Sequence, residues 1–284
     1  MRQKAPIILI LLLFAVGVGT LSYPLVSEWY NGRAQTTVIE NYGSALQELD
    51  EEKYTALREV AREYNESLFG NVILTDPFDE SAAAKSSEKY EALLDINGDG
   101  MMGIVRIPKI SVKLPVHHGT SHEVLEKGAG HLENTSLPIG GAGTHAVLSA
   151  HSGLPTSALF TDLTKLTEGD LFFLDVLDET LAYRVDKVEV VEPADVSGLR
   201  IDPAEDYVTL ITCTPYGINS HRLLVRGVRT EYEETLEAEA AEAKQIVWNW
   251  PYIIAGLVFL LLMVLFIIIL LLKKKKTDRK SPNH

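Results

Sequence analysis

The sequence predicts a mainly β protein in which a β domain lies between helical and apolar segments. Between residues 102 and 230, short β-rich runs alternate with Gly, Pro and Asn, a pattern typical of a β-barrel or sandwich of about 130 residues. Ahead of this region, apolar residues recur at helical spacing, and a long apolar run stands at each end of the chain. We therefore expect a β domain with an N-terminal helical extension and a membrane segment at each end.

The β domain is expected to contain a series of short strands. Val, Ile, Leu and Tyr in these runs favour extended backbone, and the residues between the runs favour turns. The expected strands are residues 103–107, 112–116, 146–149, 170–174, 181–191, 207–212 and 223–228. Residues 102–230 are therefore interpreted as one β domain.

The C-terminal apolar run predicts a transmembrane helix over residues 251–272. It consists almost entirely of Ile, Leu, Val and Phe, and about 20 helical residues span the roughly 30 Å hydrocarbon layer. Trp248, Trp250 and Tyr252 stand at one edge, where aromatic rings prefer the membrane interface. Residues 273–276 are all lysine, so the positive-inside rule places the tail, residues 273–284, in the cytoplasm.

The N-terminal segment, residues 1–26, is expected to be a second membrane anchor or a cleaved signal peptide. Arg2 and Lys4 precede an apolar run over residues 7–21, so the N-terminus should also stay inside. The run is short enough for a signal peptide, but it has no Ala-x-Ala site and can extend to Val26, which favours an anchor. We therefore expect a multi-pass protein of the cell membrane, with both termini cytoplasmic and the β domain extracellular.

The charge balance excludes one class of partner. The chain has 26 Lys and Arg residues against 39 Asp and Glu residues, a formal net charge of −13. Clusters of the basic residues stand at the two ends, so the part between them is more acidic than the whole chain. An acidic surface repels phosphate, which argues against nucleic-acid binding.

Three further segments connect these parts. Residues 27–69 are interpreted as a helical extension, with one long helix or a helical hairpin left open, and residues 231–250 as an acidic connector helix. Residues 70–101 resemble a linker and contain Asp76-Pro77-Phe78. Proline fixes its own φ and holds the preceding residue extended, so this tripeptide has a defined local shape, although in isolation it is an ordinary Asp-Pro turn.

Two patterns suggest metal sites, and neither is accepted. The loop that begins at Asp95 opens like a calcium-binding EF-hand, but its twelfth position is Arg106, where calcium needs a glutamate. His117, His118, His122 and His131 are close in sequence but lie among loop residues without the spacing of a zinc site. No cofactor or metal is therefore expected.

The candidate chemistry centres on Cys213, which is the only cysteine and ends a β-rich run before a Pro-Gly loop. A thiol becomes a nucleophile only as thiolate, so it needs a nearby cation or base. Arg222 follows nine residues later, across a loop that would join two antiparallel strands and return the guanidinium to the sulfur. His151 ends another β run and fits best as the base, with His221 and His145 as alternatives.

At this point the sequence resembles the sortases, membrane-bound cysteine transpeptidases of Gram-positive bacteria. Residues 209–213 read Thr-Leu-x-Thr-Cys, and the segments at 103–108, 128–131 and 149–151 and Arg222 match the family in order and spacing. The resemblance implies an eight-stranded β-barrel with Cys213 as nucleophile, His151 as general acid and base, and Arg222 as the group that holds the substrate and stabilises the oxyanion.

The resemblance narrows to class C, the pilus-assembling sortases. That class has membrane segments at both ends and a lid with an Asp-Pro-aromatic motif, which Asp76, Pro77 and Phe78 match. Asp76 is expected to offer its carboxylate to Arg222 or to bond near Cys213, and Phe78 to fill the substrate groove. Ser152 departs from the pattern, because a basic residue is expected after the histidine in this class.

The implied reaction is cleavage of a Leu-Pro-x-Thr-Gly-like (LPXTG-like) sorting signal between Thr and Gly through a thioacyl enzyme. A lysine amine of a pilin subunit then accepts the acyl group, so the implied partners are pilin subunits or surface proteins with such signals. Two alternatives stay open. One is a wall-anchoring sortase that uses a peptidoglycan amine, and the other is a hydrolase or a non-catalytic surface or assembly module.

Overall fold

The computed structural model describes residues 5–68, 74–79 and 86–233, together with Gly256, Phe259, Leu262 and Met263. Apart from these four residues, the predicted C-terminal membrane helix and tail lie outside the described residues, as does most of the predicted connector helix. The chain divides into two compact units, Met1–Leu21 with Ile246–His284, and Ser22–Gln245. Within the described part of the chain, no helix combines the length and the apolarity needed to cross a membrane.

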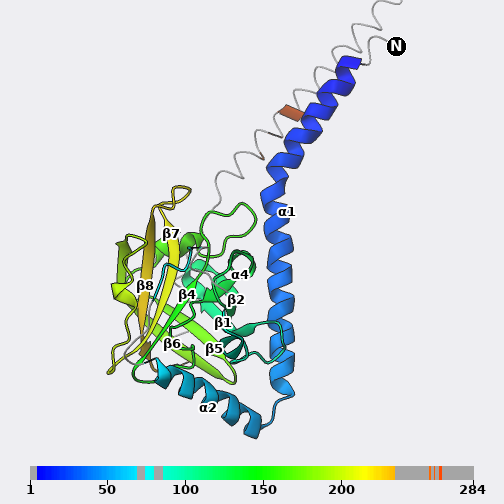
Figure 1. Ribbon diagram of the computed structural model, residues 1–284. Helices are drawn as coiled ribbons and strands as arrows, with labels where there is room; N and C mark the ends of the chain where they lie inside the picture. Colours follow the sequence, from blue (N-terminus) through cyan, green and yellow to red (C-terminus); the bar gives the residue numbers. More distant parts are fainter. Residues whose placement is uncertain are drawn as a thin grey trace, which may run out of the picture. The chain divides into compact units, whose positions relative to one another are not determined.

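The second unit contains a closed eight-stranded barrel, so the predicted mainly β fold with N-terminal helices is confirmed (Figure 1). The strands are β1 (Met101–Ile107), β2 (Val112–His118), β3 (Ala129–His131), β4 (Thr144–Ser149), β5 (Leu171–Val176), β6 (Glu179–Val191), β7 (Asp206–Thr214) and β8 (His221–Thr230). Around the barrel they follow the order β1-β2-β3-β4-β7-β8-β6-β5. Closure pairs every strand on both sides and leaves no free edge.

Short helices complete the barrel, and one strand was not anticipated from the sequence. The helix α4 (His122–Lys127) joins β2 to β3, α3 (Glu88–Glu91) precedes β1, and the 3₁₀ turns are η1 (Pro108–Ile110), η2 (Thr161–Lys165) and η3 (Ser197–Leu199). β3 has three residues. It pairs in parallel with β2 and antiparallel with β4. A strand this short has no periodicity of its own.

The N-terminal extension forms two helices rather than one, α1 (Ala5–Gln47) and α2 (Glu51–Ser67). The break falls at Asp50, whose side chain caps α2 by accepting from the amide of Lys53. Tyr42 of α1 is buried, and its hydroxyl donates to the carbonyl of Met102 in β1 at 3.2 Å. The apolar stripe of the extension therefore packs on the barrel, as its spacing predicts.

The pairing of β4 with β7 positions the candidate site. These strands are parallel and in register from Thr144 opposite Asp206 to Ser149 opposite Ile211. The carboxyl ends of parallel neighbours emerge at the same end of a sheet, so the residues that follow Ser149 lie beside the end of β7. His151 is two residues beyond Ser149, and Cys213 is two residues beyond Ile211.

Candidate active site

Cys213 and Arg222 face each other on neighbouring strands. β7 and β8 are antiparallel, and Cys213 stands directly opposite Arg222 in their register. Cys213 is half-buried and free, and Arg222 is buried, with 9% of its surface exposed. The expectation that the loop after Cys213 brings the arginine back beside it therefore matches the hairpin that forms.

The structure also brings His151 to this end of the barrel. A backbone bond from the amide of Ala150 to the carbonyl of Ile211 continues the β4–β7 pairing at 3.1 Å, and Thr212 Oγ1 donates to the carbonyl of Ala150 at 2.7 Å. His151 Nε2 is buried and has no hydrogen-bond partner among the described residues. A nitrogen left without a partner is available for proton transfer.

Asp76 forms a bidentate ion pair with Arg222. The arginine Nε donates to Asp76 Oδ1 at 2.9 Å and its Nη2 to Oδ2 at 2.6 Å, with both side chains about 11–12% exposed. Parallel N–H···O bonds of this kind are among the strongest side-chain contacts. Asp76 also accepts from the amide of Phe78 at 3.3 Å, which shapes the turn around the buried Pro77.

Phe78 covers the site from the same segment. Its ring lies 5.8 Å from the ring of His151 and 5.1 Å from the guanidinium carbon of Arg222, measured to the ring centroid. It packs, together with Leu74, on an apolar cluster formed by Leu132, Val147, Leu199, Ile211 and Leu224. The tripeptide Asp76-Pro77-Phe78 thus contacts two of the three candidate catalytic side chains, and we call it the lid.

The electrostatics favour a neutral cysteine and a neutral histidine in this arrangement. Burial raises the pKa of the Cys213 thiol; Arg222 opposes this shift and Asp76 adds to it. Burial also lowers the pKa of His151, with a further decrease from His122 and an opposing increase from Glu126. Between those two pKa values the resting pair is therefore thiol and imidazole.

Ser152 has a role that the sequence did not reveal. Its hydroxyl donates to the backbone carbonyl of Cys213 at 2.6 Å, so it joins the residue after the histidine to the cysteine itself. A serine hydroxyl is short enough to make this bond between adjacent chain segments. In place of the expected basic residue, this position has a serine, and its hydrogen bond joins the segment after β4 to the end of β7.

His122 is a second contact that sequence spacing did not predict. Its ring meets the ring of His151 nearly edge-on, with centroids 5.8 Å apart and planes 67° apart. One turn along α4, Glu126 lies 3.4 Å from His122 Nε2. The only sequence signal was its place in a cluster of histidines, which had been considered for metal binding.

The alternative bases lie elsewhere. His145 is buried at the start of β4, where Nδ1 lies 2.9 Å from the carbonyl oxygen of Arg200 and Nε2 lies 2.7 Å from Thr209 Oγ1. His221 is exposed beside Arg222 and bonds to Ser220. His151, by contrast, shares with Arg222 the contact to the ring of Phe78.

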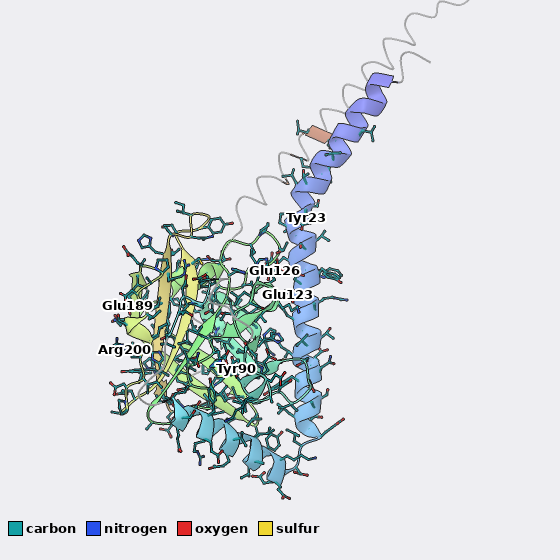
Figure 2. The ribbon with its side chains drawn as sticks, in the orientation of Figure 1. Tyr23, Tyr90, Glu123, Glu126, Glu189 and Arg200 are labelled. Atoms are coloured by element: carbon teal, nitrogen blue, oxygen red, sulfur yellow. The ribbon has the colours of Figure 1, made fainter. Side chains whose placement is uncertain are left out.

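His118 and His131 belong to a buried polar cluster around Tyr90, which is labelled in Figure 2. The Tyr90 hydroxyl lies 2.7 Å from His131 Nδ1 and accepts from the amide of Gly119, and burial lowers the pKa of His131 to about 4. Both ring nitrogens of His118 lie near backbone carbonyls, those of Gly100 and Leu93. Within the described residues, no group of three His, Cys, Asp or Glu side chains converges as a metal site would require.

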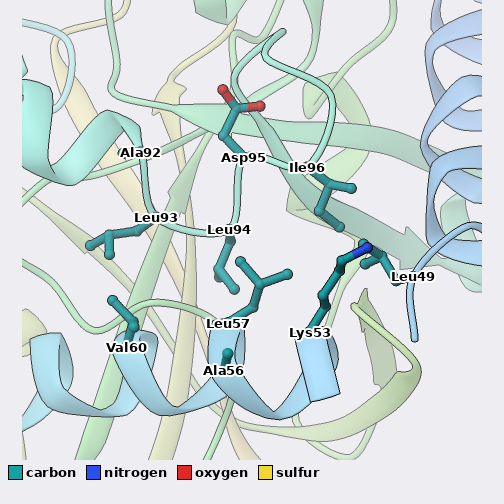
Figure 3. Close-up of a pocket in the computed structure, with 10 residues that line it drawn as sticks. All are labelled: Leu49, Lys53, Ala56, Leu57, Val60, Ala92, Leu93, Leu94, Asp95 and Ile96. Atoms are coloured by element: carbon teal, nitrogen blue, oxygen red, sulfur yellow. The ribbon is translucent and has the colours of Figure 1, made fainter. Parts of the chain in front are cut away.

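Two surface hollows lie apart from Cys213. One, of about 450 Å³, is bordered by Leu49, Lys53, Leu57 and Val60 on the α2 side and by residues 92–96 on the other (Figure 3). The other, of about 470 Å³, is lined largely by polar side chains, among them Lys187, Glu189, Arg200 and Arg226. Neither hollow includes a member of the candidate site.

Comparison with known proteins places the chain in a family. A model of the sortase domain matches residues 105–230. Sortase A of Bacillus anthracis is 27% identical over 226 residues, which is 80% of this chain and 95% of that protein. The crystal structure of sortase C-1 from Streptococcus pneumoniae is similar with a TM-score of 0.65 and 50% identity, covering 69% of this chain and 100% of that one.

A second solved structure of a sortase C is similar to the chain over the same share of its length. The pilus-related sortase C of Group B Streptococcus has a TM-score of 0.62 and 44% identity, covering 68% of this chain and 97% of that chain. These similarities extend beyond the barrel into the segments that precede it. The chain therefore belongs to the sortase family of cysteine transpeptidases, and within that family it is a class C sortase.

Proposed function

We propose that this sortase polymerises pili, with Cys213 as nucleophile, His151 as general acid and base, and Arg222 as the oxyanion-stabilising group. The observation that carries the proposal is the lid contact, in which Asp76 binds the arginine that stands opposite Cys213 while Phe78 covers His151. A solved relative with 44% identity is described as pilus-related. The substrate is a protein with an LPXTG-like sorting signal.

The first half-reaction forms the thioacyl enzyme. His151 takes the thiol proton as the sulfur of Cys213 attacks the carbonyl carbon of the signal threonine. The Thr–Gly C–N bond then breaks, and His151 returns the proton to the departing glycine amine. Because burial holds both groups neutral at rest, proton transfer accompanies the attack rather than preceding it.

Arg222 provides the electrostatic component. In the closed state its Nε and Nη2 are occupied by Asp76, and its Nη1 donates to the carbonyls of Asn219 and His221 at 3.1 Å. Withdrawal of the lid frees Nε and Nη2 as donors for the negative charge that develops on the carbonyl oxygen. Lid opening is therefore a condition for catalysis as well as for substrate entry.

The second half-reaction transfers the acyl group to an amine. A lysine side chain of another pilin subunit loses a proton to His151 and attacks the thioester, and the C–S bond breaks to give an isopeptide and the free thiol. A peptidoglycan amine in place of lysine would make the chain a wall-anchoring sortase.

The proposed location is the cell membrane, with the barrel on the extracellular side and both termini cytoplasmic. Residues 7–21 and 252–272 are apolar, and the basic residues that flank them stand at the outer ends of the chain. Within the first compact unit, Phe14 stacks on Phe259 with ring centroids 5.2 Å apart, so the two apolar segments contact each other. The two segments together support a two-pass anchor.

Mass spectrometry of the full-length chain in detergent tests the proposed activity. The wild type, Cys213→Ala and a form lacking residues 76–78 are incubated with an LPXTG-like peptide. We expect a thioacyl adduct on Cys213, more of it without the lid, and none in Cys213→Ala. Adding a lysine-bearing pilin domain or a peptidoglycan stem peptide then identifies the acceptor. Absence of the adduct in a folded, reduced, lid-free protein would contradict the proposal.

A further inference from the structure

The backbone and the imidazole of His151 are held in different ways. The backbone is fixed by a hydrogen bond, because the carbonyl accepts from the amide of Phe160 at 3.0 Å. The imidazole has a buried Nε2 without a hydrogen-bond partner among the described residues, and its ring contacts the rings of Phe78 and His122. A general base must keep its orientation while it moves a proton, so these two ring contacts bear on the reaction.

The two rings belong to segments with different roles. Each has its centroid 5.8 Å from that of His151, with planes 40° apart for Phe78 and 67° apart for His122. Phe78 is part of the lid, which withdraws in the proposed reaction and takes its ring away. His122 is the first residue of α4, which is not part of the lid. Once the lid has opened, His122 is therefore the ring that still contacts the imidazole.

The helix α4 is attached to the barrel close to the end of β4. Leu125 of α4 is buried, and a Cβ at Gly130 would come within 3.0 Å of its side chain, so the helix packs directly on β3. Gly130 stands opposite Ser149 in the pairing of β3 with β4, and His151 follows Ser149 by two residues. The contacts that place α4 beside the catalytic histidine are therefore independent of the lid.

We propose that His122 is a positioning residue for the reaction, whose ring keeps the imidazole of His151 in place after Phe78 has withdrawn. The inference rests on the proposed roles of His151 and the lid, and it adds a residue outside the three candidate catalytic side chains. Aromatic rings prefer edge-to-face geometry, so the contact restricts how the imidazole can turn. The orienting role that a carboxylate has in a Ser-His-Asp triad is taken here by a ring.

The contact also has an electrostatic consequence. Beside the effect of burial, His122 lowers the pKa of His151, and Glu126, which lies 3.4 Å from His122 Nε2, raises it. A lower pKa keeps the imidazole unprotonated, and able to accept the thiol proton, down to a lower pH. The other charged or titratable side chains on the elements around His151 are Glu123 and Lys127 of α4, Asp76 and Asp79 at the lid, Asp162 and Lys165 of η2, Cys213 of β7, and His221 and Arg222 of β8. Replacing His122 with an uncharged residue should therefore raise the pKa of His151.

Steady-state cleavage of an LPXTG-like peptide by the full-length, lid-free chain in detergent tests this inference. His122→Ala removes the ring, and His122→Phe keeps an aromatic ring without a titratable group. Glu123→Ala, at the next position of the same helix, where the side chain is also exposed, is the control. The His122 side chain is 58% exposed, so both replacements leave the core unchanged. The measurements are kcat, KM, the pH dependence of kcat/KM, and denaturant unfolding.

The two His122 variants should differ in rate but agree in pH dependence. We expect His122→Ala to lower kcat by about 2- to 10-fold, the contribution of one aromatic contact, with little change in KM. His122→Phe should restore most of kcat. In both variants the acid limb of kcat/KM should move to higher pH, because the pKa of His151 rises. Glu123→Ala should match the lid-free parent in kcat, KM and stability.

Three results contradict the inference and leave the proposed function in place. These are a kcat for His122→Ala equal to that of the parent, an equal loss of kcat in His122→Ala and His122→Phe, and an acid limb that stays at the same pH in both variants. His151→Ala in the same background separates the two levels. If that variant cleaves the peptide as fast as its parent, the proposed role of His151 is wrong, and the role of His122 is wrong with it.

Discussion

β4 has a histidine near each end, and the two are held in opposite ways. His145 is buried with both ring nitrogens within hydrogen-bond distance of a partner, and burial lowers its pKa to about 4. His151, just past the other end, touches its neighbours through ring contacts, and its Nε2 has no partner among the described residues. A histidine whose nitrogens are both engaged stabilises a fold, whereas one with a buried free nitrogen is ready to move a proton.

Matched alanine substitutions provide the strongest test of this difference. In the lid-free protein, we expect His151→Ala to slow peptide cleavage by about 10²–10⁴-fold, the usual contribution of general acid–base catalysis, with little change in stability. His145→Ala should leave cleavage nearly unchanged and lower the free energy of unfolding by about 1–3 kcal/mol, because Thr209 and the Arg200 carbonyl lose their partner. Cleavage rates and denaturant unfolding measure both effects. Loss of cleavage in a folded His145→Ala protein would reverse the assignment.

Arg222→Lys tests the role of the arginine that stands opposite Cys213, on the strand β8 that pairs with β7. A lysine keeps the positive charge beside Cys213 but has no planar fork to present two N–H groups together. We expect a loss of about 10²–10³-fold in thioacyl formation by the lid-free protein, the cost of removing an oxyanion donor. Single-turnover mass spectrometry measures it, and Arg226→Lys, which breaks a similar pair with Asp186, serves as the control. Equal losses in both variants would show that the effect is structural.

Asp76→Asn tests the lid while leaving the proposed catalytic residues unchanged. Asparagine retains an acceptor for the amide of Phe78 but loses the ionic bonds to Arg222, and hydrogen bonds to charged groups contribute about 1.5–3 kcal/mol. We expect alkylation of Cys213 by iodoacetamide to be about 10- to 100-fold faster. Burial and Asp76 both raise the pKa of Cys213, so the pH at which alkylation reaches half its maximum should fall. An unchanged rate and pH profile would mean that another contact holds the lid.

Much of this site could be predicted from local sequence. The β-rich run that ends at Cys213, the turn residues after it and the spacing to Arg222 describe a hairpin, and a hairpin fixes which residues face each other. The end of β4 likewise pointed to His151. The choice between His151 and His145 could not be made from spacing alone, because it depends on partners such as Thr209 and Arg200 that are distant in sequence.

Other features depend on contacts between distant segments and leave no local pattern. β3 has three residues and exists because β2 and β4 pair with it from either side. His122 looked like part of a histidine cluster, yet from the start of α4 its ring contacts the ring of His151. The hydrogen bond of Ser152 to the Cys213 carbonyl was not predicted either, because the partner of a hydroxyl across two parallel strands is not visible in one segment of sequence.

Ser152 gives the smallest expected effect and tests how the two strand ends are held together. Ser152→Ala removes the bond to the Cys213 carbonyl, and a neutral hydrogen bond contributes about 0.5–1.5 kcal/mol. If that energy positions His151 relative to Cys213, kcat falls by about 2- to 10-fold while KM for the peptide is unchanged, since the signal itself is not contacted. Ser152→Thr retains the hydroxyl and should restore most of kcat. A parallel loss of stability in Ser152→Ala, with kcat unaffected, would instead show that the bond supports the barrel and not the alignment of the catalytic pair.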